Sequence, residues 1–173
     1  MAAQRTINRV FIVLLFCFLA GIDTPALAEI SLGKHTDWEA FKARENGKLV
    51  CYMGAVPTKS RGKYTKRGQT FLLITHRPAE KSKNVISLQA GYTFKKTSEV
   101  ELVIGKSKFK LFTDGPWAFA SNADTDNKLV ESMIRGAALI VRGISSRGTQ
   151  TTDTYSLRGF TAAYKAIGKA CKI

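Results

Sequence analysis

The sequence is poor in the residues that most often bind metal ions. Only two of its 173 residues are histidine and only three are cysteine. A zinc site usually needs three or four nitrogen and sulfur ligands at close spacing, and the sequence contains no such group. Phosphate-loop and dinucleotide-binding signatures are also absent. We therefore expect no metal and no cofactor, and we interpret His76 as an ordinary histidine at a strand edge.

Only one long hydrophobic run occurs, at Val10–Ala20, and it is too short for a comfortable membrane span of about 20 residues. Arg5 and Arg9 precede it, and Ala26-Leu27-Ala28 gives the small-x-small pattern of a cleavage site. These features predict a signal peptide over residues 1–28. An uncleaved membrane anchor is the alternative.

The remaining residues, 29–173, have a length that suits one domain, and none of their hydrophobic stretches could span a membrane. Export predicts a periplasmic protein, with an outer-membrane-associated or secreted protein as alternatives. Cys51 and Cys171 are the two cysteines left after cleavage. In an exported chain they predict one structural disulfide. Two buried free thiols are the alternative, and pairing within or between chains stays open.

Acidic residues are scarce. Residues 29–173 contain 25 Lys and Arg but only 12 Asp and Glu, a net charge of +13. So strong a positive field favours anionic partners. For an exported protein these would be lipid head groups, lipopolysaccharide, acidic glycans or an acidic protein, and we expect no nucleic acid.

The basic residues concentrate in Ala55–Gln69, which we expect to be a loop with Tyr64 among its cations. No acid interrupts them. The candidate anion-binding residues are Lys59, Arg61, Lys63, Lys66, Arg67 and Arg147. A solvated surface that only keeps the protein soluble is the alternative interpretation.

The sequence lacks a Gly-x-Ser-x-Gly segment, the usual setting of a hydrolase serine. Because serine triads are defined by geometry, a cleft around Ser145, Ser146 and Asp153 remains the alternative, which would make the protein an envelope hydrolase. We expect instead that the protein is not an enzyme. Asp153 flanks a Thr-rich strand, where it would bond a backbone N–H or Arg147.

Turn and apolar patterns indicate a mainly β fold. Asn46-Gly47 predicts a hairpin over Trp38–Met53, with a helix from Asp37 as the alternative. A second hairpin turns at Gly105-Lys106-Ser107, between alternating apolar and polar residues. Further strands are predicted at Phe71–Thr75, Val85–Gln89, Ala138–Val141 and Thr152–Leu157.

Two short helices complete the prediction. Asp124 or Asp126 would cap the first, and Thr161 the second. The apolar face of the first helix would consist of Leu129, Val130, Met133 and Ile134. With seven or eight strands and no βαβ alternation, an antiparallel sandwich is favoured over a parallel sheet.

The sequence resembles the invasion-associated locus B family over nearly the whole of residues 38–171. The resemblance is carried by Cys51-Tyr52, Pro57, Arg61-Gly62, Gly91-Tyr92-x-Phe94-Lys95, Phe109-x-Leu111-Phe112, Ser146–Thr149 and Thr152–Phe160. It implies an exported alphaproteobacterial protein with an immunoglobulin-like β-sandwich, no known enzymatic activity and no cofactor. Some members are associated with entry into host cells, so the host cell surface is a further candidate partner.

The motif residues of the last quarter have a structural interpretation. Gly148 and Gly159 would permit tight turns, and Tyr155 and Phe160 would supply core. Asp153 would pair with Arg147 and hold the turn on the strand, or Arg147 would instead project and bind an anion. Together these observations predict an exported, non-enzymatic binding or accessory domain with a basic face.

Overall fold

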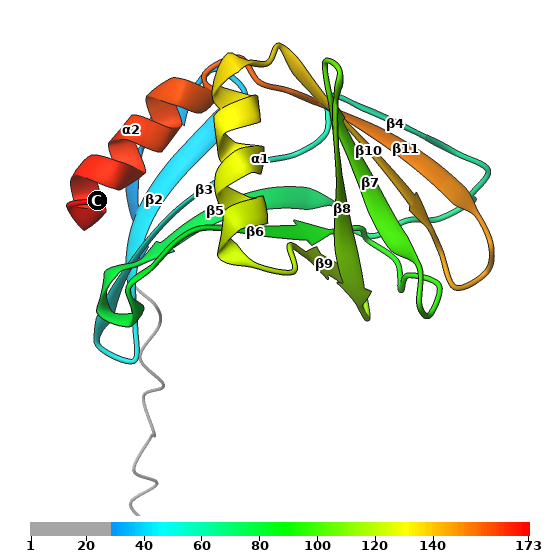
Figure 1. The fold of residues 1–173 in the computed structure, drawn as a ribbon, viewed down its shortest axis with the longest axis horizontal. Coiled ribbons are helices and arrows are strands. Elements are labelled where there is room, and N and C mark those ends of the chain that lie inside the picture. Colours follow the sequence, from blue (N-terminus) through cyan, green and yellow to red (C-terminus); the bar gives the residue numbers. More distant parts are fainter. Residues whose placement is uncertain (1–28) are drawn as a thin grey trace, which may run out of the picture.

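The computed structural model describes residues 29–173, so the predicted signal peptide lies outside the described residues (Figure 1). The described chain forms eleven strands, two α-helices and a 3₁₀ turn. The strands are β1 (Ile30–His35), β2 (Trp38–Glu45), β3 (Lys48–Ala55), β4 (Lys59–Gly62), β5 (Phe71–Arg77), β6 (Ser82–Gln89), β7 (Glu99–Ile104), β8 (Ser107–Asp114), β9 (Trp117–Phe119), β10 (Ala138–Ile144) and β11 (Gln150–Ser156). The helices are α1 (Ala123–Arg135) and α2 (Phe160–Cys171), and the 3₁₀ turn is η1 (Pro78–Glu80).

All strands pair antiparallel in one sheet, in the order β1-β2-β3-β5-β6-β9-β8-β7-β10-β11-β4. The sheet curves so strongly that its last strands return toward its first (Figure 1). The Trp38 indole N–H on β2 donates to the Ser156 carbonyl on β11 at 2.9 Å. The mainly β, antiparallel, sandwich-like fold with two helices is confirmed, and its layers are the halves of a single sheet.

Both predicted hairpins are confirmed. Asn46 and Gly47 turn between β2 and β3, both with positive φ, so the alternative helix from Asp37 is wrong. The segment Ala55–Gln69 is not wholly a loop, because Lys59–Gly62 forms β4 and pairs with β11. These four residues are all exposed. They therefore lack the apolar alternation from which a strand is predicted.

The helices begin at residues other than those predicted. Asn122 caps α1 by accepting from the Thr125 N–H at 2.9 Å, in place of Asp124 or Asp126. Asp126 is buried and accepts from the Ile86 N–H at 3.0 Å, which ties α1 to β6.

The apolar face of α1 is narrower than predicted, because Ile134 is exposed while Leu129, Val130 and Met133 are buried. Gly159 precedes α2 with φ +86°, and Thr161 makes no cap. A Cβ atom at Gly159 would overlap the His35 carbonyl oxygen, so the tight approach of α2 to β1 requires glycine.

One hydrophobic core connects both halves of the sheet with both helices. Trp38 and Phe160 form an edge-to-face pair at 4.9 Å, and Tyr155 is fully buried in the same core. The predicted disulfide is present within one chain, joining Cys51 on β3 to Cys171 at the end of α2. The disulfide fixes α2 to β3, an interior strand of the sheet.

His76 lies beside this disulfide and is not an edge residue. It is fully buried on β5, between β3 and β6, where Cys51 is its register partner. Its Nδ1 accepts from the Asn84 N–H at 3.1 Å, and its Nε2 has no hydrogen-bond partner among the described residues. Burial lowers the pKa of His76 below its ordinary value, an effect opposed by a Thr75 backbone hydrogen bond and reinforced by the Lys83 charge.

We expect the protein to lose stability on mild acidification because of this histidine. The unfolded chain takes up a proton near pH 6.5, whereas folded His76, with its lowered pKa, takes it up only at lower pH. The stability contributed by the neutral histidine is therefore present above pH 6.5 and decreases below it. One such proton gives a slope of up to about 1.4 kcal/mol per pH unit. Urea unfolding between pH 5 and 7 should show a shallower slope in His76→Gln than in the unsubstituted protein. Equal slopes would contradict the assignment.

Candidate functional site

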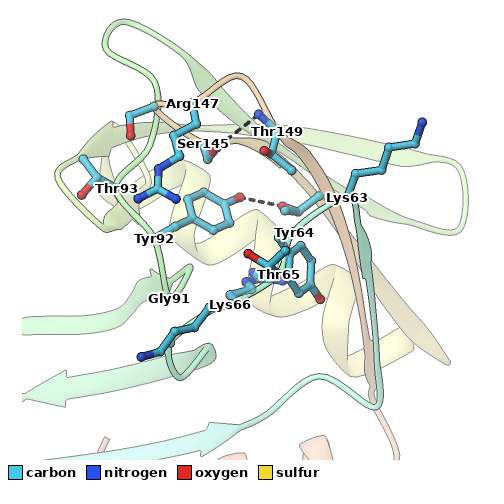
Figure 2. Close-up of a pocket in the computed structure, with 14 residues that line it drawn as sticks. Lys63, Tyr64, Thr65, Lys66, Gly91, Tyr92, Thr93, Ser145, Arg147 and Thr149 are labelled. Carbon is cyan, nitrogen blue, oxygen red and sulfur yellow. Dashed lines mark hydrogen bonds between the residues drawn. The ribbon is translucent and has the colours of Figure 1, made fainter.

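Three segments from different parts of the chain enclose a hollow of about 630 Å³ at one end of the sheet (Figure 2). They are the segment after β4 (63–68), the segment after β6 (91–93) and the tip of the β10–β11 hairpin (145–149). Since the sheet brings β4, β10 and β11 together, the end of this part of the sheet collects segments that are distant in sequence.

Backbone contacts hold the three segments against one another. The Gly68 N–H donates to the Gly91 carbonyl at 2.9 Å, and a Cβ atom at Gly91 would overlap the Gly68 carbonyl oxygen. The Ser146 N–H donates to the Thr93 carbonyl at 2.8 Å. The hairpin tip is closed by the Gly148 N–H donating to the Ser145 carbonyl, with φ +81° at Gly148. The walls of the hollow are therefore formed by hydrogen-bonded backbone.

A buried ion pair lies beneath the hollow. Arg67 donates to both carboxylate oxygens of Asp153 at 2.7 and 2.6 Å, and the two side chains are only 6% and 3% exposed. The Arg67 Nε–H donates to the Ala90 carbonyl at 2.7 Å, and a terminal nitrogen reaches the Thr70 hydroxyl at 3.3 Å. The predicted pairing of Asp153 with Arg147 is therefore wrong, because Arg67 occupies both oxygens.

Aromatic rings enclose the Arg67 guanidinium. It lies 5.0 Å from the centroid of Tyr92 and 5.6 Å from that of Tyr64, within cation–π range. Burial lowers the pKa of Arg67, but the hydrogen bonds and charge of Asp153 outweigh this, so its pKa is raised overall. Burial also raises the pKa of Tyr92, whose hydroxyl bonds the Thr151 hydroxyl at 2.6 Å. Arg67 is thus a structural cation, and its proposed role in binding an anion does not fit its surroundings.

The other cations of the hollow are exposed and make no salt bridge within residues 29–173. They are Lys63, Lys66 and Arg147. Figure 2 shows the Arg147 side chain extending from the hairpin tip toward Tyr92 and Thr93, while Lys63 and Lys66 extend to opposite sides. No acidic side chain of residues 29–173 lines the hollow. These three residues therefore carry an uncompensated positive charge.

A second hollow of about 670 Å³ adjoins the first and shares Lys63, Arg147 and Thr149 with it. Its lining is Gly62, Lys63, Arg147, Gly148, Thr149 and Gln150. The two remaining candidate cations, Lys59 and Arg61, are exposed on β4, the edge strand that leads into it, and line neither hollow.

The arrangement of Ser145, Ser146 and Asp153 does not match the alternative prediction of a catalytic cleft. Both oxygens of Asp153 are bonded to Arg67, and the Ser145 hydroxyl accepts from the Thr149 N–H at 3.1 Å. Ser146 is exposed at the hairpin tip. Neither serine is joined to Asp153 or to a histidine by a hydrogen bond within residues 29–173.

Sequence reasoning missed Tyr92 and the pair of glycines at 68 and 91 as parts of the site. Gly91-Tyr92 does belong to the segments that carry the family resemblance, and this resemblance was the signal in the sequence that could have pointed to the site. In residues 29–173, no three His, Cys, Asp or Glu side chains are grouped to hold a metal ion. No helix in the same range is both long and apolar enough to cross a membrane.

Comparison with known proteins places this geometry in a family. A solved structure titled invasion associated protein B from Bartonella henselae superimposes with a TM-score of 0.59, covering 83% of this chain and 97% of that chain at 13% sequence identity. Identity this low shows a shared fold alone. No curated protein gives a significant sequence match. The family model for invasion associated locus B (IalB) proteins matches residues 38–168, nearly all of the described chain. The chain therefore belongs to the invasion associated locus B (IalB) family.

Proposed function

We propose that this protein is an exported, non-enzymatic binding protein of the cell envelope, and that its basic hollow binds anionic groups of envelope components or of an acidic partner. The supporting observation is the hollow formed by 63–68, 91–93 and 145–149, which within the described part of the chain contains three cations without a salt bridge and no acid. Arg67, the fourth cation there, is neutralised by Asp153 and supports the walls.

Family membership supports a role linked to invasion. The name of the Bartonella protein describes it as invasion associated, and the anionic host cell surface is a partner of the same chemical kind. The proposed location is the periplasm or the outer face of the envelope. The predicted signal peptide and the net charge of +13 on residues 29–173 support this location and this choice of partner.

We expect binding to a sulfated dextran surface to be strongly dependent on salt and on the three cations. Each exposed charge contributes about 0.5 kcal/mol, so Lys63→Gln/Lys66→Gln/Arg147→Gln should weaken binding about tenfold. High salt should weaken binding of the unsubstituted protein through screening. Surface plasmon resonance at 50 and 500 mM salt measures both effects.

The matched control is Lys106→Gln/Lys165→Gln/Lys169→Gln, which removes the same charge from exposed residues outside both hollows. It should retain binding within about threefold, since only the diffuse field is reduced. Equal losses in the two triple variants would show that net charge alone is responsible, and binding unchanged by salt would contradict the electrostatic proposal.

A further inference from the structure

Two adjoining hollows lie at the tip of the β10–β11 hairpin, and we call them together the groove. Lys63, Arg147 and Thr149 line both of them and therefore mark the boundary that the two hollows share. Of the residues that the structure describes, none with an acidic side chain lines either hollow of the groove. Lys59 and Arg61 extend its positive charge along β4.

The cations do not converge on one point. Figure 2 shows Lys63 and Lys66 directed to opposite sides of the hollow and Arg147 directed between them toward Tyr92. A single phosphate or sulfate ion is bound tightly when several donors meet around it. Cations spread along a groove are suited instead to a polymer that carries one anionic group after another.

The lining excludes a lipid chain. Apart from glycines, every residue that lines either hollow has a polar or charged side chain, and no aliphatic residue is among them. An acyl chain needs apolar surface to be stabilised. A protein partner usually contributes apolar or aromatic anchors that fill pockets of matching character. Among the described residues the groove has no aliphatic pocket for an acyl chain, and its aromatic rings are those of Tyr64 and Tyr92.

The hydroxyl content favours a carbohydrate. The hydroxyl-bearing residues of the first hollow are Tyr64, Thr65, Tyr92, Thr93, Ser145, Ser146, Thr149 and Thr151. Tyr92 and Thr151 bond each other and Ser145 accepts from the Thr149 N–H, whereas Thr65, Thr93 and Ser146 are exposed. Each hydroxyl can both donate and accept a hydrogen bond, as the hydroxyl groups of a sugar do. Tyr64 is 37% exposed and presents a ring to the groove with a polar end.

We propose that this groove binds an extended acidic glycan, a chain of sugars bearing carboxylate or sulfate groups, across both hollows. This rests on the proposed anion-binding function and names the class of ligand. Arg147 and Lys63, at the junction of the hollows, contact anionic groups of neighbouring sugars, while the exposed hydroxyls of Thr65, Thr93 and Ser146 bond the sugar hydroxyls.

The test is a length series of oligogalacturonates, which are linear chains of uronic acids, titrated into the full chain by calorimetry at 50 mM salt. Affinity should rise about tenfold or more from the dimer to the hexamer and then level off, because longer chains reach both hollows at once. Neutral maltohexaose, inorganic sulfate and vesicles of phosphatidylglycerol should bind at least about tenfold more weakly than the hexamer. Arg147→Gln/Lys63→Gln should remove the dependence on length, and Lys165→Gln/Lys169→Gln should retain it.

The two proposals fail in different ways. Equal affinity for dimer and hexamer, or vesicles or inorganic sulfate bound as tightly as the hexamer, would overturn the glycan groove and leave anion binding in place. Retention of the length dependence in Arg147→Gln/Lys63→Gln would also overturn this groove as the site. Absence of salt-dependent binding to all four anionic probes (dimer, hexamer, sulfate and vesicles) would overturn the proposed function itself.

Discussion

Replacement of Asp153 by alanine should destabilise the protein by about 3–5 kcal/mol, more than removal of an exposed charge. The substitution leaves the Arg67 guanidinium buried, with its side chain 6% exposed and without its counter-ion. Arg67 would keep the Ala90 carbonyl and the two tyrosine rings, but these neutral groups do not replace a carboxylate bound at 2.6 and 2.7 Å. Urea unfolding followed by tryptophan fluorescence measures the loss.

The double variant Arg67→Met/Asp153→Leu is the informative control. Replacing both partners by apolar residues of similar volume is often nearly neutral, because no unpaired charge remains. We expect the double variant to be more stable than Asp153→Ala by about 2 kcal/mol or more. If Asp153→Ala lowered the free energy of unfolding by less than about 1 kcal/mol, the Arg67–Asp153 pair would contribute no more to stability than a surface salt bridge does.

Removal of the Cys51–Cys171 disulfide should cost about 2–5 kcal/mol. The bond closes a loop with a sequence separation of 120 residues, so the unfolded chain gains much freedom when it is broken. Both cysteines are buried, and the bond joins α2 to β3. Cys51→Ala/Cys171→Ala should therefore unfold at lower urea concentration, with early loss of α2.

Hydrogen exchange can separate the local loosening of α2 from the effect of the disulfide on the unfolded chain. Amide protons of α2 should exchange faster in the double alanine variant than those of β7 and β8, because the helix loses its covalent attachment while these strands keep their pairing. Uniform acceleration over the whole domain would show that the disulfide acts only through the unfolded chain. Unchanged stability would contradict its structural role.

The parts of the fold that the sequence predicted are those set by local chemistry. Asn46 and Gly47 determine the first hairpin themselves, because both adopt positive φ in the turn. The second hairpin follows from the alternation of buried Val100, Leu102 and Ile104 with more exposed neighbours. These signals need no knowledge of distant residues.

The missed features depend on partners far away in sequence. β4 is a strand only because β11 provides hydrogen bonds to its three polar residues and one glycine, and its sequence alone resembles a loop. Asp153 has Arg147 six positions before it, yet its partner is Arg67, 86 positions away. Sequence proximity favoured the wrong arginine, since only the folded sheet brings the segment after β4 under the β10–β11 hairpin.

Within residues 29–173 the sheet is open and ends at β1 and β4, and the outward N–H and C=O groups of such end strands can pair with a strand of another molecule. β4 is only four residues long and carries Lys59 and Arg61, so two such edges would bring like charges face to face. At the other end, a register shift between Ser31 and Gly33 interrupts β1. The shortness, charge and irregularity of these edges therefore protect the protein from aggregation, and a longer or apolar β4 would remove that protection at one end.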